Sequence, residues 1–311
     1  METRFIEVSK LYEGFLKKFC KVLAGERGFW RRIKTPDISR PGLLLAGFEE
    51  EFPAERVQII GLTERAYLLS LGERGEDAIK RLYSKEPPTV ILTSFAEKIN
   101  ERLKNLFSYY AEKFSIPTFF TEVGTTRVIS LIMDKLQYEL APTIYEHGVM
   151  VDVFGVGILL KGKSAIGKSE CAIELIRRGH RFIADDLVAI KLYPADNLLA
   201  ESPREEIKYY MEIKGVGIIH IPSIYGLQAV KEKTSLDCVI EFIPQEEFKY
   251  SPDTEVESVN YFGISVPKFK LPITPGKNMA SIVETVALVY KKGDLAYQEF
   301  KEKLRKLVDK G

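Results

Sequence analysis

Residues 162–169 read Gly-Lys-Ser-Ala-Ile-Gly-Lys-Ser, which fits the phosphate-loop pattern of Gly, any four residues and then Gly-Lys-Ser. The apolar run at residues 153–160 is short enough to be one buried strand. Residues 170–178 carry apolar side chains at helical spacing, and Gly179 is a typical helix stop. Because strand, glycine-rich loop and helix are the context that the motif requires, residues 162–169 are predicted to bind nucleotide phosphates. A glycine-rich turn without a ligand is the alternative.

The composition is that of an ordinary globular chain, long enough for about two domains. Of its 311 residues 45% are hydrophobic and 29% are charged, and 45 Lys and Arg against 44 Asp and Glu give a formal charge of +1. This balance gives no support for a nucleic-acid or membrane-surface partner. Residues 1–7 are charged, and the apolar stretch at 149–160 is too short to span a bilayer, so we expect a cytoplasmic protein without a signal peptide. The scattered residues Cys20, Cys171 and Cys238 are expected to be reduced structural thiols.

The first half of the chain alternates between predicted helices and strands. Helices are predicted at residues 3–22, 64–71, 77–83 and 95–114, and strands at residues 57–61, 88–93 and 116–120. Such alternation indicates an α/β domain, and no catalytic constellation is found in it. A helix predicted over residues 125–140 leads into the second half. We place the domain boundary near residue 130, which gives an amino-terminal α/β domain (1–130) and a second domain (131–311) that carries the chemistry.

Two adjacent carboxylates, Asp185 and Asp186, end an apolar strand predicted at residues 182–186. This strand comes one helix after the phosphate loop, and an acid at such a strand end meets the metal or the attacking group in nucleotide-binding sheets. Neighbouring side chains of a strand point to opposite faces, so at most one carboxylate can aim at the γ-phosphate unless the strand has already ended. An Asp-Asp turn without chemistry is the alternative.

No two of the three histidines, His147, His180 and His220, have the spacing of metal ligands. His180 follows the helix after the phosphate loop, where a cation would face carbonyl dipoles, and we expect a structural role for it. His147 precedes the paired strands that lead into the loop, so the topology can bring its imidazole beside the loop. Catalysis and a satisfied polar contact are both compatible with His147.

Two later segments carry further polar candidates. Glu212 stands before Gly215-Val-Gly217, where glycines allow close approach of the backbone to a ligand, although this pattern alone is weak. Residues 271–278 form a loop rich in proline and glycine that contains one cation, Lys277. An apolar helix is predicted after it at residues 280–290, and a charged helix from Asp294.

With these motifs assembled, the chain resembles the bacterial HPr kinase/phosphorylase family over nearly its whole length. The most specific shared motifs begin at His147 (HGVMVDVFGVG), Gly162 (GKSAIGKSE), Arg178 (RGHRFIADD) and Met211 (MEIKGVGII), and the first half shares DISRPG from Asp37, PAERVQ from Pro53 and TTR from Thr125. That family modifies a serine of HPr, the small phosphocarrier protein of the sugar phosphotransferase system. The resemblance implies an α/β protein of two domains, a protein-serine kinase with a phosphate loop and central sheet in its second domain, acting in carbon catabolite regulation.

The resemblance also implies roles for single residues. Lys168 would stabilise charge on the β- and γ-oxygens of ATP, and Ser169 and Glu212 would contact Mg²⁺. Asp186 would accept the serine proton in phosphorylation and return it in the reverse reaction, and His147 would be catalytic. The family further implies a homohexamer and an amino-terminal domain of uncertain role. The residues implied to hold the ATP phosphates are Gly162, Lys163, Ser164, Ala165, Ile166, Gly167, Lys168 and Ser169.

Two segments depart from the family pattern. The family's Asp-Arg-Leu-Gly segment corresponds to residues 247–253, which contain no arginine and have Lys249 as the nearest cation. The family's Pro-Val-Arg-Pro-Gly-Arg-Asn loop corresponds to residues 272–278, where Thr274 and Lys277 stand in place of two arginines. Lysine lacks the bidentate fork of a guanidinium. Because that loop is associated with the phosphate-driven reverse reaction, we hypothesise that kinase activity persists while phosphorylase activity is weakened or the acceptor has changed.

Three functions compete at this point. A protein-serine kinase of the HPr class is favoured. A related phosphate-loop enzyme acting on another protein or on a small hydroxylated substrate is motivated by the departures at Lys249 and Thr274. A non-enzymatic regulator that senses nucleotides would leave His147, Asp186 and Glu212 without a role.

Overall fold

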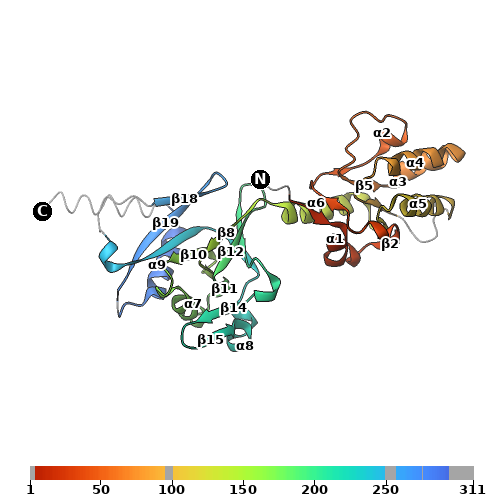
Figure 1. Cartoon of the computed structure of the whole chain (residues 1–311). Coiled ribbons are helices and arrows are strands. Elements are labelled where there is room, and N and C mark those ends of the chain that lie inside the picture. Colours follow the sequence, from red (N-terminus) through yellow and green to blue (C-terminus); the bar gives the residue numbers. More distant parts are fainter. Residues whose placement is uncertain (1–3, 95–100, 249–256, 275, 294–311) are drawn as a thin grey trace, which may run out of the picture. The chain divides into compact units, whose positions relative to one another are not determined.

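The computed structural model describes residues 4–94, 101–248, 257–274 and 276–293. The chain divides into two compact units, Met1–Ala141 and Pro142–Gly311 (Figure 1). Each unit combines helices with β-sheet, so the predicted α/β class with two domains is confirmed. The predicted boundary near residue 130 lies inside α6 (Thr125–Leu140). In the structure, the chain passes from the first unit to the second after this helix, between Ala141 and Pro142. The reason is that Val128, Ile132 and Leu136 of α6 pack into a core of the first unit.

The first unit is built on a five-stranded sheet in the order β2-β7-β6-β5-β4. Strands β4 to β7 are parallel, and β2 pairs antiparallel with β7 at the edge. Residues of α2 to α5 pack on one face of the sheet, and residues of α1 and α6 pack on the other. The elements are β1 (Ile6–Glu7), α1 (Val8–Gly14), β2 (Lys21–Ala24), β3 (Arg32–Ile33), β4 (Ile38–Ser39), α2 (Gly42–Leu45), β5 (Val57–Ile60), α3 (Leu62–Ser70), α4 (Gly75–Ser84), β6 (Val90–Leu92), α5 (Glu101–Phe114) and β7 (Thr118–Phe120).

The predicted helix over residues 3–22 is wrong. The chain instead forms β1, the short helix α1, a single 3₁₀ turn (Leu16–Lys18) and the edge strand β2. Glycine is a poor helix former, and α1 ends at Gly14. Leu11, Leu16 and Cys20 nevertheless lie in one hydrophobic cluster. Apolar spacing that looks helical is therefore satisfied by short elements wrapped around one core.

The other predicted elements of the first unit are present, α6 with its predicted bounds and the rest with shifted ends. The predicted strands correspond to β5, β6 and β7, and the predicted helices to α3, α4, α5 and α6. Residues 95–100, the first part of the helix predicted at 95–114, lie outside the described residues.

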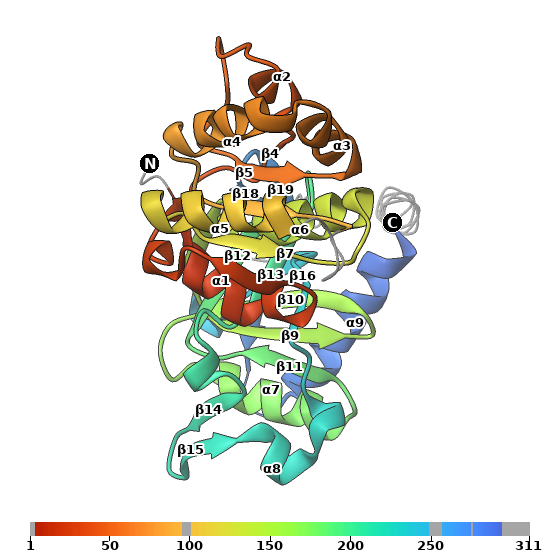
Figure 2. The same ribbon diagram turned by 90° about the vertical axis from the view of Figure 1, so that its right-hand side faces the viewer.

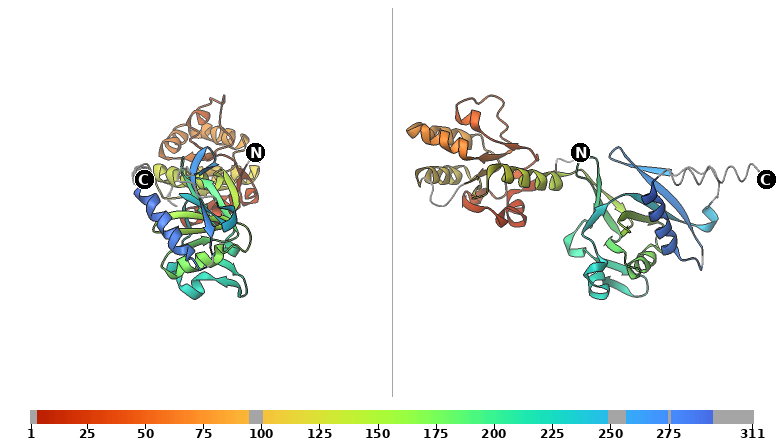
Figure 3. Two further views of the ribbon diagram at one scale, coloured as in Figure 1. Left: turned by 90° about the vertical axis from the view of Figure 1, so that its left-hand side faces the viewer. Right: turned by 180° about the vertical axis from the view of Figure 1, so that it is seen from behind.

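The second unit stacks two sheets and a helical layer. The larger sheet has the order β11-β9-β10-β17-β19-β18, and the smaller has the order β16-β13-β12-β8. Helices α7 and α9 pack on one face of the larger sheet, and the smaller sheet packs on its other face (Figures 2 and 3). The elements are β8 (Thr143–His147), β9 (Val149–Val153), β10 (Val156–Gly162), α7 (Lys168–Arg177), β11 (Arg181–Ala184), β12 (Leu187–Leu192), β13 (Leu198–Glu201), β14 (Tyr210–Ile213), β15 (Gly217–His220), α8 (Ile221–Tyr225), β16 (Lys233–Ser235), β17 (Cys238–Pro244), β18 (Glu257–Tyr261), β19 (Ile264–Ile273) and α9 (Met279–Lys292).

Strand directions gather four loops at one edge of the larger sheet. Strands β10, β17 and β19 are parallel. Strand β9 runs antiparallel to both β10 and β11, so β11 has the same direction as β10. The carboxyl ends of β11, β10, β17 and β19 therefore lie at the same edge, where nucleotide-binding sheets place their ligands.

The run at residues 153–160, predicted as one strand, is divided by a turn. Strand β9 ends at Val153, and β10 begins at Val156, directly opposite it. Phe154 and Gly155 between them have φ values of 56° and 84°, which suit a tight hairpin turn. The amide of Gly155 donates to Oδ1 of Asp152 at 2.9 Å. The sequence pattern did not predict this turn, because both strands are apolar on both faces and no alternation of apolar and polar residues marks where they end.

Cys20, Cys171 and Cys238 are free and buried, and burial raises the pKa of each thiol to about 12. These properties suit structural thiols. Within the described ranges, no helix is both long and apolar enough to cross a membrane.

Candidate active site

The phosphate loop turns from the end of β10 into the amino terminus of α7. Its backbone has positive φ at Gly162 (141°), Ala165 (60°) and Gly167 (104°). A Cβ atom on Gly162 would lie 2.6 Å from the carbonyl oxygen of Phe242, whereas a Cβ on Gly167 would meet nothing within 4 Å. The loop is thus packed tightly against the sheet at its start and open at the helix terminus, where backbone amides attract anions.

The ammonium group of Lys168 spans this loop. Its Nζ donates to the carbonyl oxygens of Gly162 and Lys163, both at 3.0 Å. Ser169 follows in the first turn of α7 and is half-buried. A cation and a hydroxyl therefore stand at the helix terminus, as the motif predicts.

Asp185 and Asp186 lie just beyond the end of β11, which stops at Ala184. The amide of Leu187 donates to the carbonyl oxygen of Asp185 at 2.8 Å, and Asp186 between them has a φ of 65°. Such a γ-turn is strained, and residues of this kind concentrate at functional sites. Because the strand has ended, its alternation no longer constrains the two carboxylates, whose exposures differ strongly.

Asp185 is the half-buried member of the pair. Burial is the largest influence on its carboxyl group and raises its pKa, while backbone hydrogen bonds from Glu212 and Asp186 and the charge of Lys168 oppose that rise. The amide of Glu212 donates to Oδ2 of Asp185 at 3.2 Å. A perturbed carboxyl group between the loop lysine and a second acid is typical of functional sites.

Asp186 and His147 meet at the exposed side of the same edge. Strand β8 pairs with β12 so that His147 lies opposite Leu187, and the amide of Gly148 donates to the carbonyl oxygen of Asp186 at 3.1 Å. Nδ1 of His147 is 3.9 Å from Oδ1 of Asp186, and their side chains are 83% and 93% exposed. The topology thus brings His147 to the predicted acid, within reach of a large substrate.

Glu212 reaches the site on the hairpin of β14 and β15. Met211 and Ile219 of this hairpin pack into the core that holds α7, and the side chain of Glu212 is exposed on the other face. The hydrogen bond from its amide to Asp185 ties the hairpin to the end of β11.

The loops after β17 and β19 complete the edge. Oγ1 of Thr274 donates to Oε1 of Gln245 at 2.8 Å, and Lys277 is exposed. Lys163 of the phosphate loop forms an ion pair with Glu247 at 2.7 Å. Lys249 and the helix predicted from Asp294 lie outside the described residues. Apart from Lys249, the structure therefore places all the predicted site residues along this edge.

The remaining histidines have structural contacts. His180 is buried, and its Nε2 is 2.9 Å from Oε1 of Glu284, which joins the end of α7 to α9. Nδ1 of His220 is 2.7 Å from Oγ of Ser223 at the start of α8. The structural role predicted for His180 is confirmed.

Two charged residues beside the site were missed by the sequence reasoning. Nζ of Lys161 lies 2.6 Å from Oε2 of Glu146. Lys161 directly precedes Gly162, and Glu146 directly precedes His147. The available signal was a lysine at the end of an otherwise apolar strand, where solvent exposure is the default explanation.

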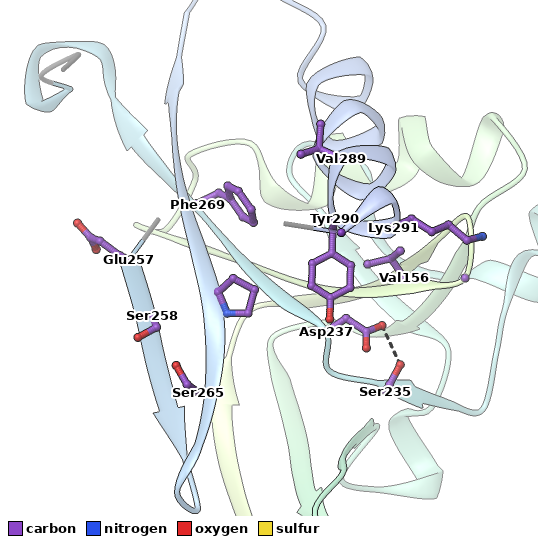
Figure 4. Close-up of a pocket in the computed structure, with 13 residues that line it drawn as sticks. Val156, Ser235, Asp237, Glu257, Ser258, Ser265, Phe269, Val289, Tyr290 and Lys291 are labelled. Carbon is purple, nitrogen blue, oxygen red and sulfur yellow. Dashed lines mark hydrogen bonds between the residues drawn. The ribbon is translucent and has the colours of Figure 1, made fainter. Parts of the chain in front are cut away.

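A cavity of about 720 Å³ lies away from this edge, between the end of α9 and strands β18 and β19 (Figure 4). Its lining includes Val156 and Asp237, which lie at the amino ends of β10 and β17. None of the predicted site residues that the structure describes lines this cavity. The predicted site residues that the structure describes therefore lie at an open edge of the sheet rather than in this cavity.

The described part of the chain contains no group of three or more His, Cys, Asp and Glu residues that could form a metal site by themselves. Magnesium is commonly held by one or two protein oxygens together with substrate phosphates and water. Ser169, Glu212 and Asp185 suit that kind of site better than a closed protein cage.

Comparison with known proteins gives one consistent result. Residues 6–136 match the family model described as HPr Serine kinase N terminus, and residues 138–306 match the model described as HPr Serine kinase C-terminal domain. The chain is 38% identical over 290 residues to the HPr kinase/phosphorylase of Caldicellulosiruptor bescii, with 90% of each chain covered. It is 35% identical over 303 residues to that of Halalkalibacterium halodurans, with 95% of this chain and 96% of the relative covered.

A solved structure is also similar to part of the chain. It is titled as the Hpr(Ser) kinase/phosphatase from Coxiella burnetii, and it matches with 28% identity and a TM-score of 0.47. The match covers 51% of this chain and 97% of that one.

Proposed function

The chain belongs to the HPr serine kinase family, and from that membership we propose that it transfers the γ-phosphate of ATP to a serine hydroxyl of the phosphocarrier protein HPr. The supporting observation is that the phosphate loop, Asp186 and His147 lie at one open edge of the sheet. Because the carboxylate of Asp186 is 93% exposed, a serine carried on the surface of another protein can reach it.

Asp186 and His147 suit the proton transfer that this reaction needs. A serine hydroxyl is a weak nucleophile, so a carboxylate that accepts its proton during attack assists the reaction. The imidazole of His147, with Nδ1 3.9 Å from Oδ1 of Asp186, would help to orient that carboxylate. Lys168 contributes positive charge where negative charge gathers on the transferred group.

The residues present fit ATP and Mg²⁺. The open space over Gly167 and the amide-rich start of α7 suit phosphates, and Lys168 supplies the cation of the motif. Ser169 and Glu212 would hold Mg²⁺, and Asp185 is a third oxygen donor beside them. When bound, the metal supplies charge neutralisation for phosphoryl transfer.

The decisive test is to incubate the chain with γ-labelled ATP, Mg²⁺ and HPr. Label on a serine of HPr, located by mass spectrometry, is the expected result. HPr with that serine replaced by alanine is the matched control and should remain unlabelled. Label on another protein or on a small hydroxylated compound, with HPr unlabelled, would contradict the proposed acceptor.

We further propose that the reverse, phosphate-driven reaction is weaker than the kinase reaction. Thr274 donates its hydroxyl to Gln245, and Lys277 offers a point charge rather than a guanidinium fork. Thr274 and Lys277, in the loop after β19, would therefore hold inorganic phosphate less firmly than two arginines would.

Phosphorylated HPr and inorganic phosphate test this second proposal. Pyrophosphate release is expected to be at least about tenfold slower than the kinase reaction, and the double variant Thr274→Arg, Lys277→Arg should accelerate it. Lys10→Arg, a substitution on the exposed surface of the first unit, controls for a general effect of added arginine. Release at the kinase rate by the unchanged chain would refute the proposal.

We propose a homohexamer in the cytoplasm, with the amino-terminal unit serving regulation or assembly. Sedimentation of the purified chain should give the mass of six copies, and a monomer or dimer would contradict it.

A further inference from the structure

The ion pair between Glu146 and Lys161 connects the larger and the smaller sheet of the second unit. It lies beside the edge that carries the predicted site residues. Glu146 lies in β8 of the smaller sheet, and Lys161 lies in β10 of the larger one. Oε2 of Glu146 and Nζ of Lys161 are 2.6 Å apart, and their side chains are 24% and 31% exposed. The pair is thus sheltered by the sheets rather than free on the surface, where ion pairs contribute little.

Each partner immediately precedes a residue of the site. Glu146 comes before His147, and Lys161 comes before Gly162, where the phosphate loop begins. Consecutive side chains of a strand point to opposite faces, so Glu146 turns inward between the sheets while His147 turns outward to solvent. Anchoring Glu146 therefore fixes the backbone of His147 without blocking its imidazole.

The surroundings of Glu146 are confined. The buried hydroxyl of Tyr261 lies near the carboxylate of Glu146. Burial, and then the negative charge of Glu146, raises the pKa of this phenol. Glu146 thus has two polar neighbours, the ammonium group of Lys161 and the buried phenol of Tyr261.

His147 depends on such an anchor because its own side chain is 83% exposed. Its backbone is joined to the start of β12 by the pairing of His147 with Leu187, and to the turn at Asp186 by the hydrogen bond from Gly148. His147 belongs to the smaller sheet, the phosphate loop follows β10 of the larger sheet, and Asp186 lies in the turn from β11 of the larger sheet to β12 of the smaller one. The position of His147 relative to the phosphate loop consequently depends on contacts between the two sheets.

We infer that Glu146 and Lys161 form a positioning pair, which holds His147 in its place beside Asp186 and the phosphate loop. The inference rests on the proposed function, since it concerns the geometry of the same phosphoryl transfer. Neither residue touches a reacting atom; both act through the strand ends that they join. Misplacement of reacting groups by about 1 Å can cost up to about 100-fold in rate, so a lost anchor should appear in turnover.

The chain offers a matched control in the ion pair of Lys191 with Glu201. Its atoms are 2.7 Å apart, its side chains are each 14% exposed, and it joins β12 to β13 within the smaller sheet. Breaking this pair removes a similar sheltered ion pair and leaves the contact of Glu146 with Lys161, which connects the two sheets, in place.

The experiment compares Glu146→Gln with Glu201→Gln in the full chain. We expect kcat for transfer from ATP to HPr to fall about tenfold in Glu146→Gln, with the Kd for ATP unchanged, and to stay within about twofold of the parent in Glu201→Gln. The exchanged pair Glu146→Lys, Lys161→Glu should recover most of the lost kcat. An unchanged kcat in Glu146→Gln, or an equal loss in both single variants, would overturn the inference. If Glu146→Gln does not fold, Lys161→Gln takes its place, with the same expected results.

Amide hydrogen exchange supplies a readout that needs no turnover. Peptides covering residues 143–149 should exchange faster in Glu146→Gln than in the parent chain, and at the parent rate in Glu201→Gln. If the parent chain fails to phosphorylate HPr, the proposed function fails, and exchange alone then decides whether the pair anchors β8. Equal exchange in the parent and in Glu146→Gln would reject the anchor.

Discussion

Asp185 and Asp186 are identical neighbours placed in opposite environments. Asp185 is half-buried and accepts a hydrogen bond from Glu212, while Asp186 is exposed in a strained turn beside His147. Two carboxylates held in such different environments commonly take different chemical roles. We assign proton acceptance to Asp186 and metal support to Asp185 on this basis.

Replacing Asp186 with Asn should remove transfer but not the fold. Asn tolerates positive φ as well as Asp does, so the turn at residue 186 is retained. The rate of HPr phosphorylation is expected to fall at least about 100-fold, with ATP binding unchanged by calorimetry. Asp196→Asn, on an exposed loop, serves as the control and should keep the parent rate. Survival of activity in Asp186→Asn would show that another group accepts the proton.

Replacing Asp185 with Asn should stabilise the chain near neutral pH. The pKa of Asp185 is raised above its ordinary value of 3.8, chiefly by burial. A raised pKa means that the folded chain binds the proton more tightly, so this contribution to stability is present below pH 3.8 and is lost as the pH rises through the folded pKa. Urea unfolding at about pH 7 should therefore show a higher free energy of unfolding for Asp185→Asn. At about pH 3 the difference from the parent should vanish, and a difference independent of pH would contradict the assignment.

At the scale of elements, the phosphate loop owes its shape to the way β10 packs against β17. Gly162 pairs with Phe242, and a side chain at Gly162 would run into the Phe242 carbonyl. The loop can leave the sheet only because this position has no Cβ. The first glycine of the motif thus has a steric task in addition to approaching phosphate.

Gly162→Ala should cost more stability than Gly155→Ala, although both glycines have positive φ. A Cβ on Gly155 meets nothing within 4 Å, so only backbone strain of about 1 kcal/mol is expected there. At Gly162 strain and a backbone clash combine, and about 3 kcal/mol is expected together with loss of ATP binding. Urea midpoints of the two variants measure the difference, and equal losses would mean that the loop start can shift freely.

At the scale of the whole molecule, the two units have separate hydrophobic cores. The clusters of the first unit contain residues only from that unit, and the same holds for the second. The proposed ATP site lies wholly in the second unit. The two units should therefore respond independently to core substitutions and to ligand.

Calorimetry of the full chain should show two transitions. Phe107→Ala, in the core of the first unit, is expected to remove about 3–5 kcal/mol from one transition and leave the other in place. Adding ATP and Mg²⁺ should raise only the transition that Phe107→Ala leaves unchanged. Leu175→Ala provides the reciprocal control in the second unit. A single transition shifted by both variants would show that the units unfold together.

Much of the fold was predictable because local patterns were sufficient for it. Helix α6 (Thr125–Leu140) was predicted with its observed bounds, since its apolar stripe faces one core and Pro142 ends the pattern. The prediction of a helix over residues 3–22 was wrong, because several short elements packed around one hydrophobic cluster produce the same spacing of apolar residues as a helix. The turn at Phe154 and Gly155 was not predicted, because strands that are buried on both faces lack the alternation of apolar and polar residues that marks the ends of a strand.

The phosphate loop and its neighbouring acids were determined by the sequence alone, because each function needs particular residue types at short spacing along the chain. Their assembly was decided only by the tertiary structure. Strand direction brings the ends of β11, β10, β17 and β19 to one edge, pairing of β8 with β12 carries His147 to Asp186, and the contact of Glu146 with Lys161 joins the two sheets. Contacts between residues far apart in the chain depend on packing, and packing leaves no local pattern in the sequence.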